Sequence, residues 1–161
     1  MRLIAIAIGM SFSLVAEDRL RALYPAMPTP DLALPFVLLF GLHCERPTRL
    51  SLVSLLALLR AVLTREPVGR DLLLMLLATE GLARARRLLF IGSFANLLVL
   101  SSLTALWFVC GRTVFIGVID GQSVDVSLAL GAAGCAAVVS PFLVRLVVWS
   151  RALGALVEDW S

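Results

Sequence analysis

The chain contains no lysine, a single histidine and few charged residues of any kind. Charged residues make up 16% of its 161 positions, against about 25% in a typical soluble domain. The 14 basic residues are all arginine, are spread along the chain, and leave a net charge of only +3. Binding to a nucleic acid requires many clustered cationic contacts, so we expect no nucleic-acid partner.

Metal-binding and catalytic motifs are missing too. Cys44, Cys110 and Cys135 are odd in number and far apart, and no Cys or His spacing suits a metal ion. His43 adjoins Cys44 and Glu45, but adjacent residues on a helix point in different directions and do not form a catalytic triad. The sequence contains no nucleophile–base pair and no glycine-rich phosphate loop. It therefore predicts no metal, no cofactor and no enzymatic activity.

Apolar residues are abundant, at 60% of the chain, and the mean hydropathy is +0.99. No water satisfies backbone groups inside a bilayer, so apolar runs there form helices or a closed barrel. Barrel strands alternate apolar and polar residues, whereas Leu88–Cys110 and Val126–Trp149 are apolar on all sides. The sequence predicts an all-α membrane protein with one membrane domain spanning residues 1–161.

Six apolar segments are predicted to cross the membrane as a compact bundle. A full crossing needs about 20 residues, and only the last two segments reach that length. The shorter four are expected to use flanking polar residues, to thin the bilayer or to lie partly inside the protein. The segments are Leu3–Ala16, Leu32–Cys44, Leu50–Leu63, Leu72–Arg84, Leu88–Cys110 and Val126–Trp149.

The first segment has the basic start and the length of a signal peptide. Leu14 is too large for the position three residues before a cleavage site after Ala16. Because further apolar segments follow, we expect Leu3–Ala16 to remain as an uncleaved first helix.

The distribution of arginine predicts the orientation of the segments, because cytoplasmic connections carry an excess of basic residues. Six crossings with both termini in the cytoplasm satisfy this rule, except at the third connection, where Arg65 and Arg70 face outward. The arginines placed inside are Arg2, Arg46, Arg49, Arg84, Arg86, Arg87 and Arg151.

Two charged residues, Arg60 and Glu80, lie within apolar runs on either side of a short connection. An unpaired charge in hydrocarbon costs on the order of 3 kcal/mol, so we predict an intramembrane ion pair between them. An equally weighted alternative places Arg60 at the outer headgroups and Glu80 at the inner surface. Pro67 is expected to end a helix and Gly69 to permit the chain reversal.

Small residues recur on the last segment, at Ala129, Ala133 and Ala137. This spacing lets helix backbones approach closely, and packing within the fold is favoured over a partner interface. Asp120-Gly121 lies between β-branched residues, a hairpin signal that predicts a short outer ribbon or a re-entrant loop, which a partner would contact. A loop that only dips into the membrane interface is an equally weighted alternative.

The fifth segment carries several polar residues, for which we expect interhelical hydrogen bonds. Pro141 is expected to kink the last helix. The polar residues of the fifth segment are Ser93, Asn96, Ser101, Ser102 and Thr104.

Several motifs between residues 30 and 112 follow a known family pattern. Pro30-Asp31-Leu32 opens the second segment, and a Leu-rich helix runs into Pro67-Val68-Gly69, followed by another apolar helix and the basic cluster Arg84–Arg87. In these motifs, and in its size and six-segment layout, the chain resembles the rod-shape-determining MreD proteins. It departs from the pattern at Arg60-Ala61, where the family commonly carries an acidic residue late in the third helix.

The resemblance implies a non-enzymatic scaffold in the bacterial inner membrane, within the cell-elongation complex that makes peptidoglycan. The partners it implies are an MreC-like single-span membrane protein and, through it, peptidoglycan synthases and an MreB-like filament, besides membrane lipids.

The family's fold is similar to that of the substrate-binding subunits of energy-coupling-factor transporters. The alternative function is therefore a vitamin-binding or other small-molecule-binding membrane subunit of such a transporter. That function requires an outward-opening polar pocket lined by several hydrogen-bonding groups, and the sequence offers few of them: Asn96, Gln122 and the serines of the fifth segment.

Overall fold

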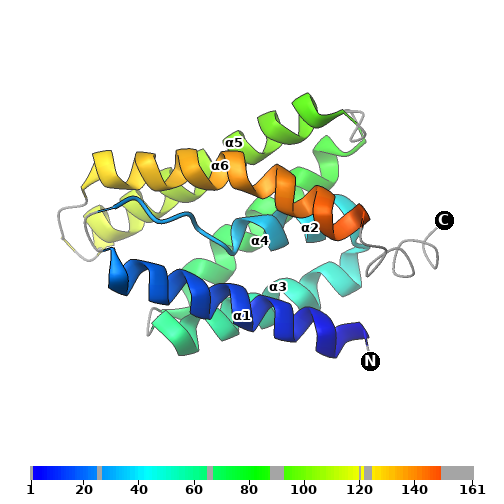
Figure 1. The fold of residues 1–161 in the computed structure, drawn as a ribbon, viewed down its shortest axis with the longest axis horizontal. Helices are drawn as coiled ribbons and strands as arrows, with labels where there is room; N and C mark the ends of the chain where they lie inside the picture. The colour runs from blue at the N-terminus through cyan, green and yellow to red at the C-terminus, as the bar shows by residue number, and fades with distance from the viewer. Residues whose placement is uncertain are drawn as a thin grey trace.

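The computed structural model describes residues 2–24, 27–64, 67–87, 93–119, 121 and 125–149. These residues form six α-helices, and none of them lies in a strand (Figure 1). The all-α prediction is therefore confirmed for the part of the chain that is described. The helices are α1 (Arg2–Leu23), α2 (Leu34–His43), α3 (Arg46–Thr64), α4 (Val68–Ala85), α5 (Phe94–Val114) and α6 (Val126–Trp149).

Three helical stretches are long and apolar enough to cross a membrane: Arg46–Thr64, Phe94–Gly117 and Val126–Val147. Large apolar side chains such as Val62 and Phe142 are exposed on the outer surfaces of these helices. Such a surface is unfavourable in water and favourable in lipid. Length, composition and surface together indicate a membrane protein.

Successive helices run in opposite directions along the long axis of the bundle (Figure 1). The start of α1 and the end of α6 therefore lie at one end, here called the terminal end. The connections from α3 to α4 and from α5 to α6 lie at the opposite end, here called the distal end. Helix α2 occupies the centre, where it packs against α3, α4, α5 and α6.

The connection between α1 and α2 enters the bundle from the distal end as non-helical chain (Figure 1). Non-helical backbone at membrane depth needs hydrogen-bond partners from the protein. The Leu32 N–H donates to Glu17 Oε2 at 2.9 Å, and the Ala33 N–H donates to Asp31 Oδ1 at 3.0 Å. Because the chain becomes helical only at this depth, α2 has 10 residues and begins in the interior.

Helices α5 and α6 pack closely through small residues, and Ala137 is only 7% exposed. Pro141 lacks an N–H, so the Ala137 carbonyl one turn earlier loses its partner within the helix. The Ser101 hydroxyl of α5 donates to this carbonyl at 2.9 Å. Ser101 thus makes an interhelical bond as expected, whereas Ser102 and Thr104 donate to carbonyls of their own helix.

The predicted ribbon after α5 is wrong for Phe115–Ile119, which continues the helix as a π-helical turn. Its β-branched residues favour extended chain, but a continued helix satisfies the backbone groups internally. Gly121 has φ +62°, the left-handed conformation that glycine adopts without strain. Asp120 and residues 122–124 lie outside the described residues.

Candidate functional site: an ion cluster and a cavity at the distal end

Arg60 of α3 is 1% exposed and contacts three carboxylates. Its Nη1 lies 2.8 Å from Asp31 Oδ1, and its Nε lies 3.2 Å from Asp71 Oδ2. Its Nη2 lies 3.5 Å from Glu17 Oε1. Because the acids come from the α1–α2 connection, α4 and α1, one guanidinium joins four segments of the chain.

Two further arginines complete this arrangement. Arg112 of α5 approaches Asp31 Oδ2 at 3.2 Å and Asp71 Oδ1 at 3.5 Å. Arg21 of α1 bonds Glu17 at 3.0 Å. We call the six residues the distal ion cluster: Glu17, Arg21, Asp31, Arg60, Asp71 and Arg112.

The distal ion cluster combines three guanidinium groups with three carboxyl groups. Moving a charge out of water costs several kcal/mol, and only close pairing offsets this cost. Asp31 meets this condition, because its Oδ1 lies 2.8 Å from Arg60 Nη1 and its Oδ2 lies 3.2 Å from Arg112 Nη1.

The predicted pair of Arg60 and Glu80 is not formed. Helices α3 and α4 are antiparallel, and Asp71 takes the position facing Arg60. Glu80 lies nine residues further along α4, about 13 Å away along the helix axis. Its Oε1 is 2.6 Å from Arg49 Nη2 and 3.7 Å from Arg46 Nε. The alternative for Arg60, an extended side chain at the headgroups, is also wrong because Arg60 is buried.

The error arose from the assumed position of the chain reversal, which the sequence placed near Val68. Pro67 is the residue immediately before α4, and Gly69 lies in the first turn of that helix without a positive φ. Helix α3 ends at Thr64 and α4 begins at Val68, so α4 begins earlier in the sequence than predicted. An earlier reversal brings Asp71, rather than a residue further along α4, opposite Arg60.

Glu17, Asp71 and Arg112 carry no motif in the sequence that marks them as site residues. Each is close to an apolar run, but only the fold shows that they converge. Asp31 had been singled out, together with Pro30, through the family resemblance alone. In the structure both lie in the non-helical connection, and Asp31 contacts two arginines.

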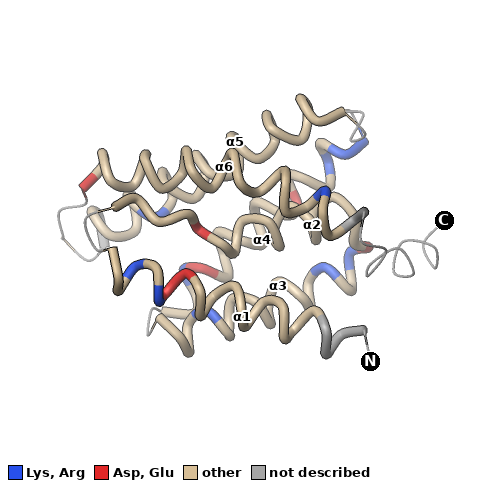
Figure 2. The backbone as a smooth tube through the Cα atoms, viewed as in Figure 1, with Lys and Arg blue, Asp and Glu red and all other residues tan. Residues whose placement is uncertain are grey.

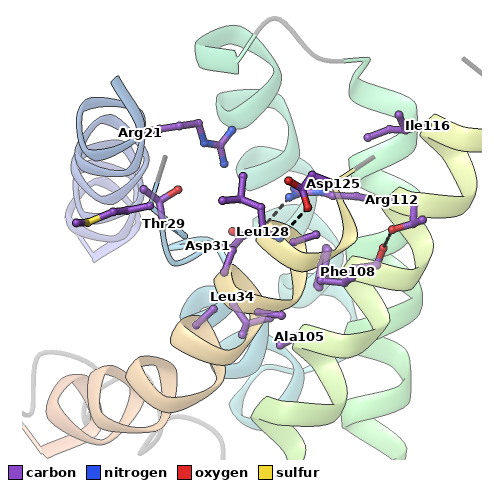
Figure 3. Close-up of a pocket in the computed structure, with 17 residues that line it drawn as sticks. Arg21, Thr29, Asp31, Leu34, Ala105, Phe108, Arg112, Ile116, Asp125 and Leu128 are labelled. Carbon is purple, nitrogen blue, oxygen red and sulfur yellow. Dashed lines mark hydrogen bonds and ion pairs between the residues drawn. The ribbon is translucent and has the colours of Figure 1, made fainter. Parts of the chain in front are cut away.

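A cavity of about 450 Å³ lies beside the distal ion cluster, between the α1–α2 connection, α5 and α6 (Figure 3). Arg21, Asp31 and Arg112 line it together with Thr29 and Thr113. Its remaining wall is mostly apolar and includes Leu34, Ala105, Phe108, Ala129, Ala133 and Ala136.

The described polar residues at this cavity are not the few that the sequence offers for a pocket. Asn96 and Ser101 lie on α5 but do not line the cavity, and Gln122 is outside the described residues. The polar part of the wall consists of charged groups together with Thr29 and Thr113.

A second hollow, of about 390 Å³, lies between α4 and α5. The two helices are in close contact at Gly111, where an added Cβ would clash with Leu74 Cδ2. Trp107 Nε1 donates to the Leu74 carbonyl at 3.2 Å near the same contact. Beyond it, a groove is lined by Ala78, Gly81, Leu82, Ala85, Leu100, Leu103 and Thr104. We call this hollow the α4–α5 groove.

The terminal end carries a second set of charges, so that the charged positions gather toward the two ends of the bundle (Figure 2). Arg49 and Arg46 contact Glu80 there, and Arg86 Nη1 donates to the Leu42 carbonyl at 3.1 Å. This last bond satisfies a carbonyl at the end of α2.

Neither charge cluster resembles a metal site. Among the residues that the structure describes, no three His, Cys, Asp or Glu side chains are grouped to hold a metal ion. The acids of the distal ion cluster face arginines instead. Cys44 is buried as an unpaired thiol, and burial raises its pKa to about 11, which makes it a poor nucleophile.

Comparison with protein-family models, curated proteins and solved structures finds no match for this chain.

Proposed function

We propose that this protein is a non-enzymatic scaffold of the MreD type, which holds a single-span MreC-like partner in the bacterial inner membrane. The observation that carries the proposal is the α4–α5 groove, because it offers a membrane-embedded surface suited to another helix. Through the partner, the scaffold would contribute to the peptidoglycan-synthesising elongation complex.

The depth of the groove favours an apolar occupant. Leu100, Leu103 and Thr104 lie in the middle of the apolar stretch Phe94–Gly117, at the level of the hydrocarbon core in a crossing helix. The Thr104 hydroxyl is already bonded to the Leu100 carbonyl. A lipid chain or a transmembrane helix satisfies these conditions.

The small residues of α4 favour a helix over a lipid chain. Ala78, Gly81 and Ala85 are spaced three and four residues apart and line the same groove. Small residues at this spacing let a second helix backbone approach closely, which a lipid chain does not require. A Cβ at Gly81 would meet nothing within 4 Å, so the protein's own packing does not demand a glycine there.

The charge distribution supports an orientation with the terminal end in the cytoplasm. Arg46, Arg84, Arg86 and Arg87 are exposed at that end, where basic residues favour the cytoplasmic side. At the distal end, arginines of the ion cluster are matched by carboxylates. We therefore propose six crossings with both termini inside, where α2 makes its crossing together with the non-helical connection before it.

The partner surface proposed here differs from the surface on α6 that the sequence offered as an alternative. Ala137 is buried against α5, and Ala133 faces the distal cavity. Both side chains are therefore used inside the fold.

The test is co-purification of the tagged protein with an MreC-like partner expressed in the same cells. Gly81→Leu fills the α4–α5 groove and is expected to reduce the recovered partner by more than about tenfold, because a misfitted helix loses close backbone contact. The matched control is Gly134→Leu, since Gly134 is exposed on α6 and its Cβ would also meet nothing within 4 Å.

Loss of the partner in Gly81→Leu with normal recovery in Gly134→Leu supports the proposal. Normal recovery in Gly81→Leu contradicts the groove as the docking site. Loss in Gly134→Leu alone places the interface on α6 instead.

A further inference from the structure

We propose that the distal cavity binds a small amphipathic molecule, with an anionic head group between Arg21 and Arg112 and an apolar body along α5 and α6. The proposal does not depend on the scaffold function, since the cavity and the α4–α5 groove lie against different sets of α5 residues.

The two arginines reach the cavity from different walls. Arg21 extends from α1 toward the cavity, and Arg112 extends from α5 on the other side (Figure 3). The guanidinium of Arg112 lies 5.9 Å from the centre of the Phe108 ring, which also lines the cavity. A planar guanidinium is suited to bind a carboxylate or phosphate through paired hydrogen bonds.

Hydrogen-bond donors are available at the cavity, whereas three of the four oxygens of its two carboxylates, Asp31 and Asp125, already have hydrogen-bond or ion-pair partners among the described residues. Arg21 has five N–H donors, and its side chain is 50% exposed with one ion-pair partner among the described residues, Glu17. Asp31 already accepts bonds from Arg60 and the Ala33 N–H. Asp125 accepts from the backbone and hydroxyl of Ser127 at the start of α6. The spare donors favour an anionic ligand over a cationic one.

The apolar wall requires an apolar body on the ligand. Leu34 and Phe108 form part of it, and α6 contributes Ala129, Ala133 and Ala136. Larger side chains at these alanines would fill the space, so the small residues of α6 maintain the cavity. A volume of about 450 Å³ lies within the usual range of small-molecule sites, about 300 to 1,000 Å³.

The head group is tested by native mass spectrometry of the full-length protein in detergent, titrated with oleate or with oleyl alcohol. We expect one oleate per chain, and about tenfold weaker oleate binding in Arg21→Gln, because one charge-assisted hydrogen bond is lost. Oleyl alcohol binding is expected to be the same in both proteins. The matched control is Arg87→Gln, an exposed arginine at the terminal end. Equal oleate binding in Arg21→Gln and Arg87→Gln overturns the proposal.

The apolar body is tested with Ala133→Leu, which fills the cavity, and with Val138→Leu, an exposed position of α6 outside it. Ala133→Leu is expected to abolish binding of both probes, while Val138→Leu retains it. Ala129→Leu fills the same cavity and replaces Ala133→Leu if the latter does not fold. Retained binding in a folded cavity variant overturns the proposal.

The anionic head group belongs either to a membrane phospholipid or to a free amphipathic acid. Titration with phosphatidylglycerol distinguishes these two ligands. If it binds one per chain, depends on Arg21 and competes with oleate, the natural occupant is a membrane phospholipid. If oleate binds in an excess of phosphatidylglycerol, the occupant is a free amphipathic acid. If neither probe depends on Arg21, the cavity is not an anionic site and the proposal fails.

Discussion

Arg60 and Asp71 face each other across α3 and α4, with 3.2 Å between Arg60 Nε and Asp71 Oδ2 and each side chain 1% exposed. Glu80 lies nine positions further along α4 and pairs with Arg49 and Arg46 near the other end of the same two helices. The α3–α4 hairpin is therefore held by ion pairs near both ends. This arrangement makes the contributions of Asp71 and Glu80 to stability separable.

Arg60→Gln is expected to lower the free energy of unfolding in detergent by about 3 to 5 kcal/mol, because it leaves buried carboxylates without their partner. Arg46→Gln is the control, since Arg46 is 78% exposed and lies 3.7 Å from Glu80; its expected loss is below about 1 kcal/mol. A double-mutant cycle should show coupling of Arg60 with Asp71 and additivity with Glu80. Strong coupling of Arg60 to Glu80 would disprove this pairing.

Asp31→Asn tests the charge state of the distal ion cluster. The Asp31 carboxylate contacts the guanidinium groups of Arg60 and Arg112, and an amide removes the charge that both arginines pair with. The variant should therefore be less stable than the wild type by about 2 kcal/mol or more.

Thermal unfolding in detergent measures this difference. Asp18→Asn is the matched control, because Asp18 is an exposed aspartate on α1. Equal stability of Asp31→Asn and Asp18→Asn would mean that the Asp31 carboxylate does not stabilise the distal ion cluster.

Ser101→Ala should cost about 0.6 to 2 kcal/mol, since the Ala137 carbonyl is left without a donor. In a Pro141→Ala background the restored N–H can bond that carbonyl, so the same Ser101 substitution should cost much less. Ser102→Ala is the control, because Ser102 is exposed and donates within its own helix. Equal costs of Ser101→Ala in both backgrounds would refute this explanation.

Two glycines should respond in opposite directions to alanine. A Cβ at Gly41 would lie 2.7 Å from Leu82 Cβ, so Gly41→Ala should push α2 and α4 apart and destabilise the protein. Gly69 is exposed in α4 with open space around it, and Gly69→Ala should stabilise by about 0.5 to 1 kcal/mol through helix propensity. If Gly69→Ala is less stable than the wild type, Gly69 is needed for the chain reversal between α3 and α4, as the sequence predicted.

The apolar runs predicted the helices well, because the length and the apolar character of a segment are local properties of the sequence. Val126–Trp149 was predicted with the bounds that the structure gives. The charged residues were harder to interpret, since a shift of the α3–α4 reversal by a few residues changes the partner of Arg60. The convergence of Glu17 and Arg112 could not be predicted at all, because it depends on how distant segments pack.

The central claim is that the distal end and the terminal end of the bundle lie on opposite sides of the membrane. Cysteine accessibility tests this claim most directly. Single cysteines replace Asp18 and Gly121 at the distal end, and Glu45 and Arg87 at the terminal end, in a background without Cys44, Cys110 and Cys135. A membrane-impermeant thiol reagent should label the first two in intact cells and the last two only after the membrane is opened. Labelling of all four positions in intact cells, or of none before opening, would contradict the account.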